Sequence, residues 1–136
     1  MRTYLKHTIL LFSLLVAFQL AAQEKNDDII VQVEAALKAS SSKELTKFLH
    51  EKVEIKLEGE RKEYSVNQAE VILKQFFQQY PATGFEFIHN GNNSSGGIVY
   101  AIGTYSSDGG DHRVVIRART FDENTKVYRL EFTKER

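Results

Sequence analysis

The stretch Gly97-Ile98-Val99-Tyr100-Ala101-Ile102-Gly103-Thr104-Tyr105-Ser106-Ser107 decides the fold of this 136-residue chain. It is apolar on both of its alternate faces, and β-branched and aromatic residues dominate it. We therefore predict a central β-strand with a core on one face and a partial cover on the other. The segments that follow it have the pattern of further strands beside it in the same sheet. The segments before it have the pattern of a targeting segment followed by helices.

The chain after this strand returns twice through short turns. Asp108-Gly109-Gly110 predicts the first turn, and a strand from His112 to Thr120 follows it. A second turn lies between Asp122 and Thr125, and a last strand runs from Lys126 to Thr133. Four strands, counting one from Phe85 to His89, are close enough in sequence to form an antiparallel meander.

A long helix precedes these strands. Ser65 and Gln68 form a capping box at its start, and Pro81 ends it. Its apolar residues recur at helical spacing: Ala69, Ile72, Leu73, Phe76, Phe77 and Tyr80. Between Phe85-to-His89 and the central strand, Asn90 to Gly97 predicts a loop because it contains only polar residues and glycine.

The first part of the domain predicts two helices and a hairpin. Asn26 or Asp27 caps a helix, and Ser41 with Glu44 makes a capping box for a short second helix. The apolar stripe of the first is Ile29, Ile30, Val33, Ala36 and Leu37, and the second carries Leu45, Phe48 and Leu49. Val53, Ile55 and Leu57 then alternate with charged residues as in a half-buried strand, and residues 59–63 turn the chain.

Residues 1–22 have the pattern of a secretory signal peptide. Arg2 and Lys6 precede an apolar run from Ile9 to Leu20, with small residues at Ala21 and Ala22. The run is shorter than the roughly 20 residues that a transmembrane helix needs. We expect cleavage after Ala22, a single mature domain of residues 23–136, and a periplasmic or secreted location with no lipid anchor.

Charge and cysteine content exclude several classes of function. Without Arg2 and Lys6, the chain keeps 16 basic and 18 acidic residues, a net charge of −2. This balance gives no reason to expect nucleic acid or an anionic membrane as a partner. The chain has no cysteine, which excludes disulfides, cysteine nucleophiles and zinc–thiolate sites. We expect no metal and no cofactor, since Asp108-Gly109-Gly110-Asp111 lacks the alternating acids of a calcium loop.

The order of elements predicts an α+β fold, with helices packed on one curved, mainly antiparallel sheet. This order is similar to the cone-shaped, cystatin-like fold of nuclear-transport-factor-like domains. More narrowly, the chain resembles a family of small secreted proteins of Gram-negative bacteria that has only a domain-of-unknown-function label. The motifs that carry this resemblance are Ala35-Ala36-Leu37-Lys38, Lys43-Glu44-Leu45, Tyr64-Ser65, Tyr100-Ala101-Ile102-Gly103-Thr104, Arg113-Val114 and Leu130-Glu131-Phe132. They are packing and turn motifs, so the resemblance implies a fold and a compartment but no catalytic residues.

The length of the first hairpin turn decides which face of the central strand lies inside. A three-residue turn puts Ile98, Tyr100 and Ile102 inside, beside Val114, Ile116 and Ala118. We predict this register because these residues bury more apolar area than Val99, Ala101 and Gly103 do. A two- or four-residue turn would instead put Arg117 beside Tyr100 on a common face and form a polar site there. For the second hairpin we predict a three- or five-residue turn, which puts Tyr128, Leu130 and Phe132 inside.

This register predicts a ligand pocket between the sheet and the long helix. Its candidate residues are Phe76, Phe87, His89, Tyr100, Ile116 and Tyr128. Enzymes with the resembled fold place an acid–base pair in such a pocket. No carboxylate lies on the predicted inner face, and His89 with Tyr100 is its one polar combination. We therefore predict no catalytic residues.

Two classes of function remain open. The first is a non-catalytic secreted or periplasmic domain that binds a small apolar ligand or a protein partner. The second is a cofactor-free enzyme of the isomerase or dehydratase type.

A homodimer is also possible from the sequence, through an outer sheet face with Val99, Ala101, Tyr105 and Val115 in its seam. The outward arginines 113, 117, 119 and 129 predict cross-strand ion pairs, and an acidic partner is the alternative.

Overall fold

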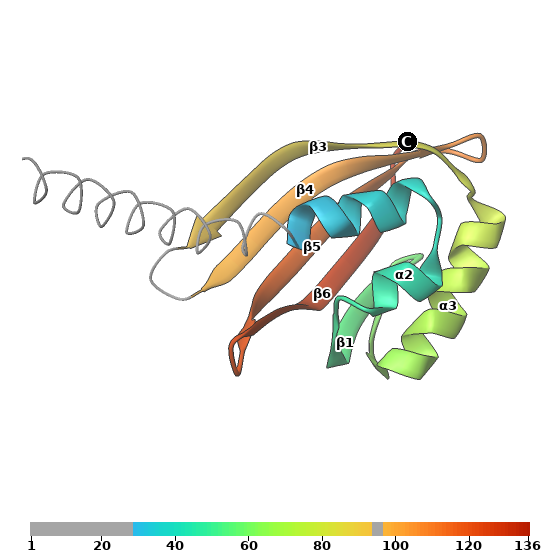
Figure 1. The fold of residues 1–136 in the computed structure, drawn as a ribbon. Coiled ribbons are helices and arrows are strands. Elements are labelled where there is room, and N and C mark those ends of the chain that lie inside the picture. The colour runs from blue at the N-terminus through green and yellow to red at the C-terminus, as the bar shows by residue number, and fades with distance from the viewer. Residues whose placement is uncertain (1–28, 94–96) are drawn as a thin grey trace, which may run out of the picture.

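The structure, a computed structural model, describes residues 29–93 and 97–136. A helix over residues 29–38, called the N-terminal helix below, comes first. It is followed by α2 (Ser42–Thr46), β1 (Leu49–Leu57), β2 (Glu60–Ser65), α3 (Val66–Gln79), β3 (Ala82–Asn93), β4 (Ile98–Ser107), β5 (His112–Phe121) and β6 (Asn124–Lys134). The strands form one curved sheet in the order β2-β1-β6-β5-β4-β3, and the helices lie on one face of it (Figure 1). The predicted α+β fold is confirmed; the predicted signal peptide and first helix cap lie outside the described residues.

The helix starts follow from their capping residues. Ser65 Oγ accepts a hydrogen bond from the Gln68 amide at 3.3 Å, and the Gln68 side chain accepts one from the Ser65 amide at 3.1 Å. At α2 only half of the predicted box forms: Ser41 Oγ accepts from the Glu44 amide, while the Glu44 carboxylate pairs with Lys47 at 2.9 Å. The prediction that Phe48 and Leu49 belong to this helix is wrong, because α2 ends at Thr46, Phe48 lies in the turn that follows, and Leu49 begins β1.

The meander of β3, β4, β5 and β6 is antiparallel, as predicted. Strand β1 pairs antiparallel with β2 and parallel with β6, which joins the first hairpin to the meander in one sheet. The loop predicted from Asn90 to Gly97 is shorter than expected, since β3 continues to Asn93 and pairs with β4 to its end.

The register predicted for the β4–β5 hairpin is wrong. Tyr100 pairs with Arg117 and Ala101 with Ile116. Val99, Ala101, Gly103 and Tyr105 therefore face the helices and are buried, whereas Ile98, Tyr100 and Ile102 face outward and are half-buried. The prediction that Val99, Ala101 and Tyr105 lie in a dimer seam on the outer face is wrong for the same reason. The packing of Gly103 explains the choice: a Cβ atom there would lie 2.4 Å from Cζ of Phe85, so the small residues of β4 lie where a neighbouring ring needs room.

The β5–β6 hairpin has a two-residue turn instead of the predicted three or five. Asp122 and Glu123 form it, both at positive φ (45° and 74°), as the tight hairpin turns that match strand twist require. A bulge then adds one residue to β6 between the partners of Arg117 and Ala118. Leu130 and Phe132 still face inward as predicted, but Val127 takes the inner position near the turn and Tyr128 faces outward.

Aromatic side chains fill the space between α3 and the sheet. The Phe76 ring lies 4.5 Å from Phe132, 5.7 Å from Tyr105 and 5.0 Å from His112, measured between ring centroids. All four residues are buried, and so is Phe77. The inside of the cone is thus a packed core, with rings in the tilted and edge-on arrangements that aromatic side chains favour.

Candidate functional site: a groove and an outer face

The six residues predicted to line one pocket separate into three places. Phe76 and Ile116 are buried in the core, and Phe87 lines a groove beside the N-terminal helix. His89, Tyr100 and Tyr128 lie on the outer face of the sheet, away from the helices. No cavity brings the six together in the described part of the chain, because the register of β4 and the bulge in β6 turn Tyr100 and Tyr128 outward.

The hydroxyl groups of Tyr105 and Ser40 are occupied by structural hydrogen bonds, whereas the buried Nδ1 of His112 has no hydrogen-bond partner among the described residues. The Tyr105 hydroxyl donates to the carbonyl of Tyr80 and lies 3.1 Å from Ser40 Oγ. Ser40 Oγ in turn accepts from the Ala82 amide at 2.8 Å. This series of hydrogen bonds connects the end of α3 to the start of β3, so the two hydroxyl groups stabilise the fold.

Burial changes the pKa values of two core side chains. It raises the pKa of the Tyr105 hydroxyl, which therefore stays protonated at neutral pH. It lowers the pKa of His112, and the positive charge of Lys134 lowers that pKa further. Among the described residues, no carboxylate forms a hydrogen bond with either group, and neither has the partner that a general acid–base pair needs.

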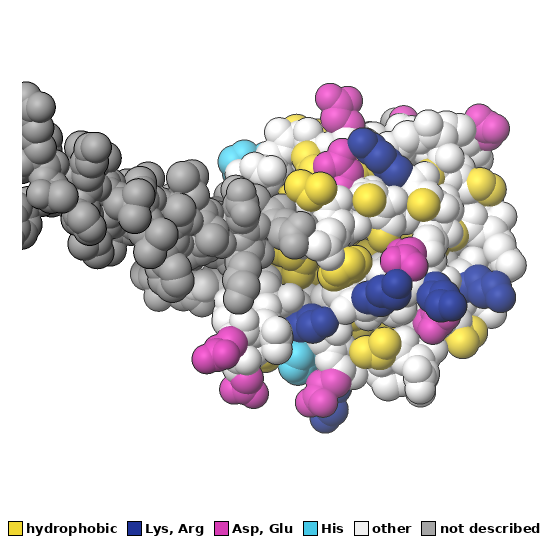
Figure 2. All heavy atoms as spheres, viewed as in Figure 1, with side chains coloured by type: hydrophobic (Ala, Val, Ile, Leu, Met, Phe, Trp, Pro, Cys, Tyr) yellow, Lys and Arg dark blue, Asp and Glu magenta, His cyan; other side chains and the backbone are white. Residues whose placement is uncertain are grey.

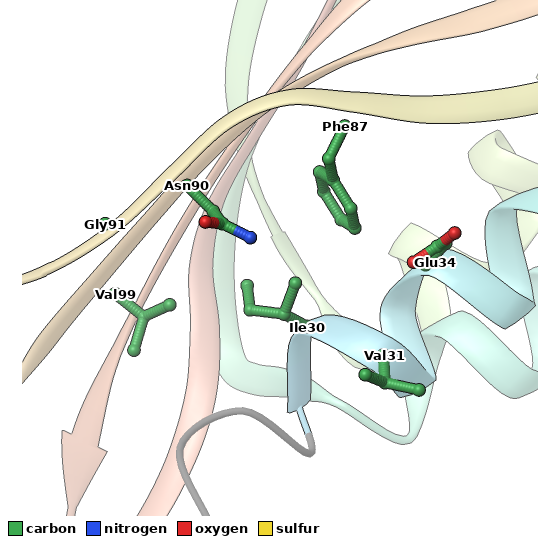
Figure 3. Close-up of a pocket in the computed structure, with 7 residues that line it drawn as sticks. All are labelled: Ile30, Val31, Glu34, Phe87, Asn90, Gly91 and Val99. Atoms are coloured by element: carbon green, nitrogen blue, oxygen red, sulfur yellow. The ribbon is translucent and has the colours of Figure 1, made fainter.

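A groove of about 220 Å³ lies between the N-terminal helix and strands β3 and β4. Figure 3 shows the Phe87 ring and the Asn90 amide on the sheet side and Ile30 on the helix side, all directed toward the same space. Its lining residues are Ile30, Val31, Glu34, Phe87, Asn90, Gly91 and Val99. Apolar walls with a few polar groups are typical of small-molecule sites.

A bulge in β3 builds this groove. Phe87 pairs with Gly103 and His89 with Ile102, which leaves Ile88 as an extra residue, two-thirds exposed. The bulge moves Asn90 opposite the inward-facing Ala101 and turns His89 to the outer face. Sequence reasoning missed Asn90 because strict alternation from Phe85 and Phe87 puts His89 inside.

The groove opens on the face of the molecule that carries the helices. Figure 2 shows hydrophobic side chains exposed on this face near the start of the N-terminal helix, with basic and acidic side chains mixed over the rest. Val31 is 60% exposed there. Glu34, on the same helix, pairs with Lys38 at 2.7 Å, which holds its carboxylate in place at the groove.

The outer face brings together three residues that the sequence had singled out. The His89 ring lies 6.2 Å from the Tyr100 ring, and the Arg117 guanidinium lies 5.7 Å from the centre of that ring. These are the contacts expected from the alternative turn length, which puts Arg117 beside Tyr100. Further along β5, Arg119 lies over the rings of Phe121 and Tyr128, at 4.5 and 5.4 Å.

Other classes of site find no support in the residues described. Over residues 29–93 and 97–136, no three His, Asp or Glu side chains gather in an arrangement that would hold a metal ion. No helix in the same ranges has the length and apolar character needed to cross a membrane.

Comparison with solved structures supports the resemblance seen in the sequence. The structure of a DUF4783 family protein from Bacteroides ovatus matches this one with a TM-score of 0.73 at 24% identity, over 77% of this chain and 94% of that one. A second, from Bacteroides fragilis, has a TM-score of 0.72 at 26% identity, over 77% and 97%. An NTF2-like protein of unknown function from Burkholderia xenovorans has a TM-score of 0.63 at 14% identity, over 84% and 87%. No curated protein matches the chain significantly.

The family model for a domain of unknown function, DUF4783, matches residues 30–133. This range holds the N-terminal helix from its second described residue, the whole of β1 to β5, and β6 up to its penultimate residue. The chain therefore belongs to the DUF4783 family and has an NTF2-like fold.

Proposed function

We propose that this protein is a non-catalytic binding domain that takes a small ligand in the groove beside the N-terminal helix. The observation that carries the proposal is the division of the inner face. Its centre is filled by aromatic side chains, while a hollow of about 220 Å³ remains between the N-terminal helix and β3. A ligand can enter this hollow without displacing the core.

The lining indicates the chemistry of the ligand. Ile30, Phe87 and Val99 offer apolar surface, and burying such surface is worth roughly 25 cal/mol per Å². Asn90 offers both a donor and an acceptor, and Glu34 offers a carboxylate already paired with Lys38. We expect a compact apolar ligand with one hydrogen-bonding end.

An isomerase or dehydratase is less well supported. Such an enzyme would need a proton donor and acceptor facing each other across the bound ligand. Glu34 is the one carboxylate among the groove-lining residues, and neither a histidine nor a tyrosine lines the groove with it.

We also propose that the domain acts in the periplasm or outside the cell. The support is the basic start, apolar run and small residues of 1–22. N-terminal sequencing of the protein recovered from the periplasm or medium tests this: a chain beginning at Gln23 is expected, and an intact Met1 in the cytoplasm would contradict it.

Native mass spectrometry of gently purified residues 23–136 tests for a bound ligand. We expect a mass above that of the polypeptide because of a bound ligand. Denaturation should release this ligand and leave the mass of the polypeptide alone. Asn90→Phe should abolish it, because an aromatic ring at this exposed groove position fills the hollow. His89→Phe is the matched control, since His89 is the exposed neighbour on the opposite face of β3. Equal retention by both variants, or no adduct on the wild-type protein, would contradict the proposal.

A further inference from the structure

We infer that the outer face of β5 and β6 is a docking surface for an acidic, extended segment of a partner protein. The surface, called the arginine patch below, consists of Tyr100, Arg117, Arg119, Phe121 and Tyr128, with Lys126 and Arg129 at its β6 side. It is separate from the groove, which lies on the helix-covered face, and the two are testable independently.

The first observation is that two of its arginines have no acid partner among the residues that the structure describes. Arg61 and Arg129 both bind Glu54, at 3.0 and 3.3 Å, and Arg113 pairs with Glu135 at 3.5 Å. Arg117 and Arg119 form no ion pair and no hydrogen bond with any other described residue, although they lie on the same strand face as Arg113.

The second observation is the placement of like charges across the strands. Arg117 is directly opposite Arg129, and Arg119 is directly opposite Lys126. Like charges in these positions destabilise a sheet. Two of the patch's cations have partners outside it: Arg129 pairs with Glu54, and Lys126 donates a hydrogen bond to the carbonyl of Lys47. An anion bound at Arg117 and Arg119 would relieve the remaining repulsion.

The third observation is that aromatic rings hold the two guanidinium groups in position. Tyr100 lies beneath Arg117, and Phe121 and Tyr128 lie beneath Arg119. Phe121 is itself stacked on His50, with 3.7 Å between ring centroids. Such cation–π contacts order the arginines before a partner arrives, which reduces the entropy lost on binding.

The spacing of the arginines favours an extended peptide. Arg117 and Arg119 are two residues apart on one strand, so their Cα atoms are about 6.8 Å apart. A second extended chain carries carboxylates at the same spacing when acids occupy alternate positions, and each carboxylate can bind a guanidinium with two hydrogen bonds. Nucleic acid fits less well, because the guanidinium groups already cover the aromatic rings on which bases would stack.

Fluorescence anisotropy with residues 23–136 and a labelled octapeptide of alternating Glu and Thr tests this inference. We expect saturable binding that weakens as ionic strength rises. The double variant Arg117→Gln, Arg119→Gln should bind at least tenfold more weakly, and Arg113→Gln within about twofold of wild type. Circular dichroism checks that each variant remains folded.

Several outcomes would overturn the inference. Equal loss of affinity in Arg113→Gln would show general charge attraction. Equal binding of a peptide with its glutamates in one block, or of heparin, would remove the requirement for an extended acidic strand. Light scattering that shows a wild-type dimer, dissociated by the double variant, would assign the patch to a second copy of this chain. An absence of peptide binding at low ionic strength would also refute it.

Discussion

Replacing Gly103 with alanine should destabilise the domain by about 1–2 kcal/mol. A Cβ atom at this position would lie 2.4 and 2.9 Å from two ring atoms of Phe85 and 2.8 Å from the carbonyl oxygen of Glu86. The Phe85 side chain is buried and packed against Phe87, and the carbonyl belongs to the paired backbone of β3. Overpacking of this kind costs roughly 1–3 kcal/mol, and the loss of unfolded-state entropy in a glycine-to-alanine change offsets about 0.4–1 kcal/mol.

Urea and thermal unfolding of residues 23–136, followed by circular dichroism, measure the effect. About 4 °C per kcal/mol is expected for a domain of this size, so the melting temperature should fall by about 4–8 °C. Gly84→Ala is the matched control, because a Cβ at Gly84 on the neighbouring strand meets no atom within 4 Å. It should be neutral or slightly stabilising.

A double-mutant cycle identifies the clash. Phe85→Leu removes the two ring atoms nearest to the new methyl group, so Gly103→Ala should be less destabilising in that background. Part of the destabilisation by Gly103→Ala will remain, because the Glu86 carbonyl oxygen still lies close to the new methyl group. If Gly103→Ala is as stable as Gly84→Ala, the packing argument for the register of β4 is refuted.

Three further predictions concern hydrogen bonds and protonation. Ser65→Ala should lower the free energy of unfolding by about 1 kcal/mol in urea denaturation, because it removes the N-cap of α3. Tyr105→Phe should cost roughly 1–3 kcal/mol, since the buried Tyr80 carbonyl loses its donor; an unchanged urea midpoint would contradict this. Burial lowers the pKa of His112, so the unfolded chain binds more protons than the folded chain once the pH falls below about 6.5, and stability should fall there. His112→Gln should flatten this pH dependence relative to wild type, and identical slopes below pH 6.5 would refute the assignment.

Local structure was predictable because it depends on neighbours in the sequence. The capping box at Ser65, the apolar stripe of α3 and the stop at Pro81 involve residues within a few positions of each other, and each formed as expected. The alternation along β1, β4 and β5 likewise comes from the geometry of a strand with one buried face.

The candidate site was predictable only in part, because two bulges move side chains between faces. The extra residue at Ile88 brings Asn90 to the groove and sends His89 outward. The extra residue at Tyr128 has the same effect in β6. A bulge adds one residue without a clear sequence signal, and each one reverses the faces of the strand residues beyond it.

The sequence alone determined the α+β class, the helix boundaries near the caps and the antiparallel meander, because short-range spacing encodes them. The tertiary structure decided which face of Ile98–Ser107 lies inside. Comparing apolar areas favoured Ile98, Tyr100 and Ile102, but that comparison ignored the volume of the partner. The Phe85 ring occupies the space above Gly103, so the smaller side chains face the core and Tyr100 joins the arginines outside.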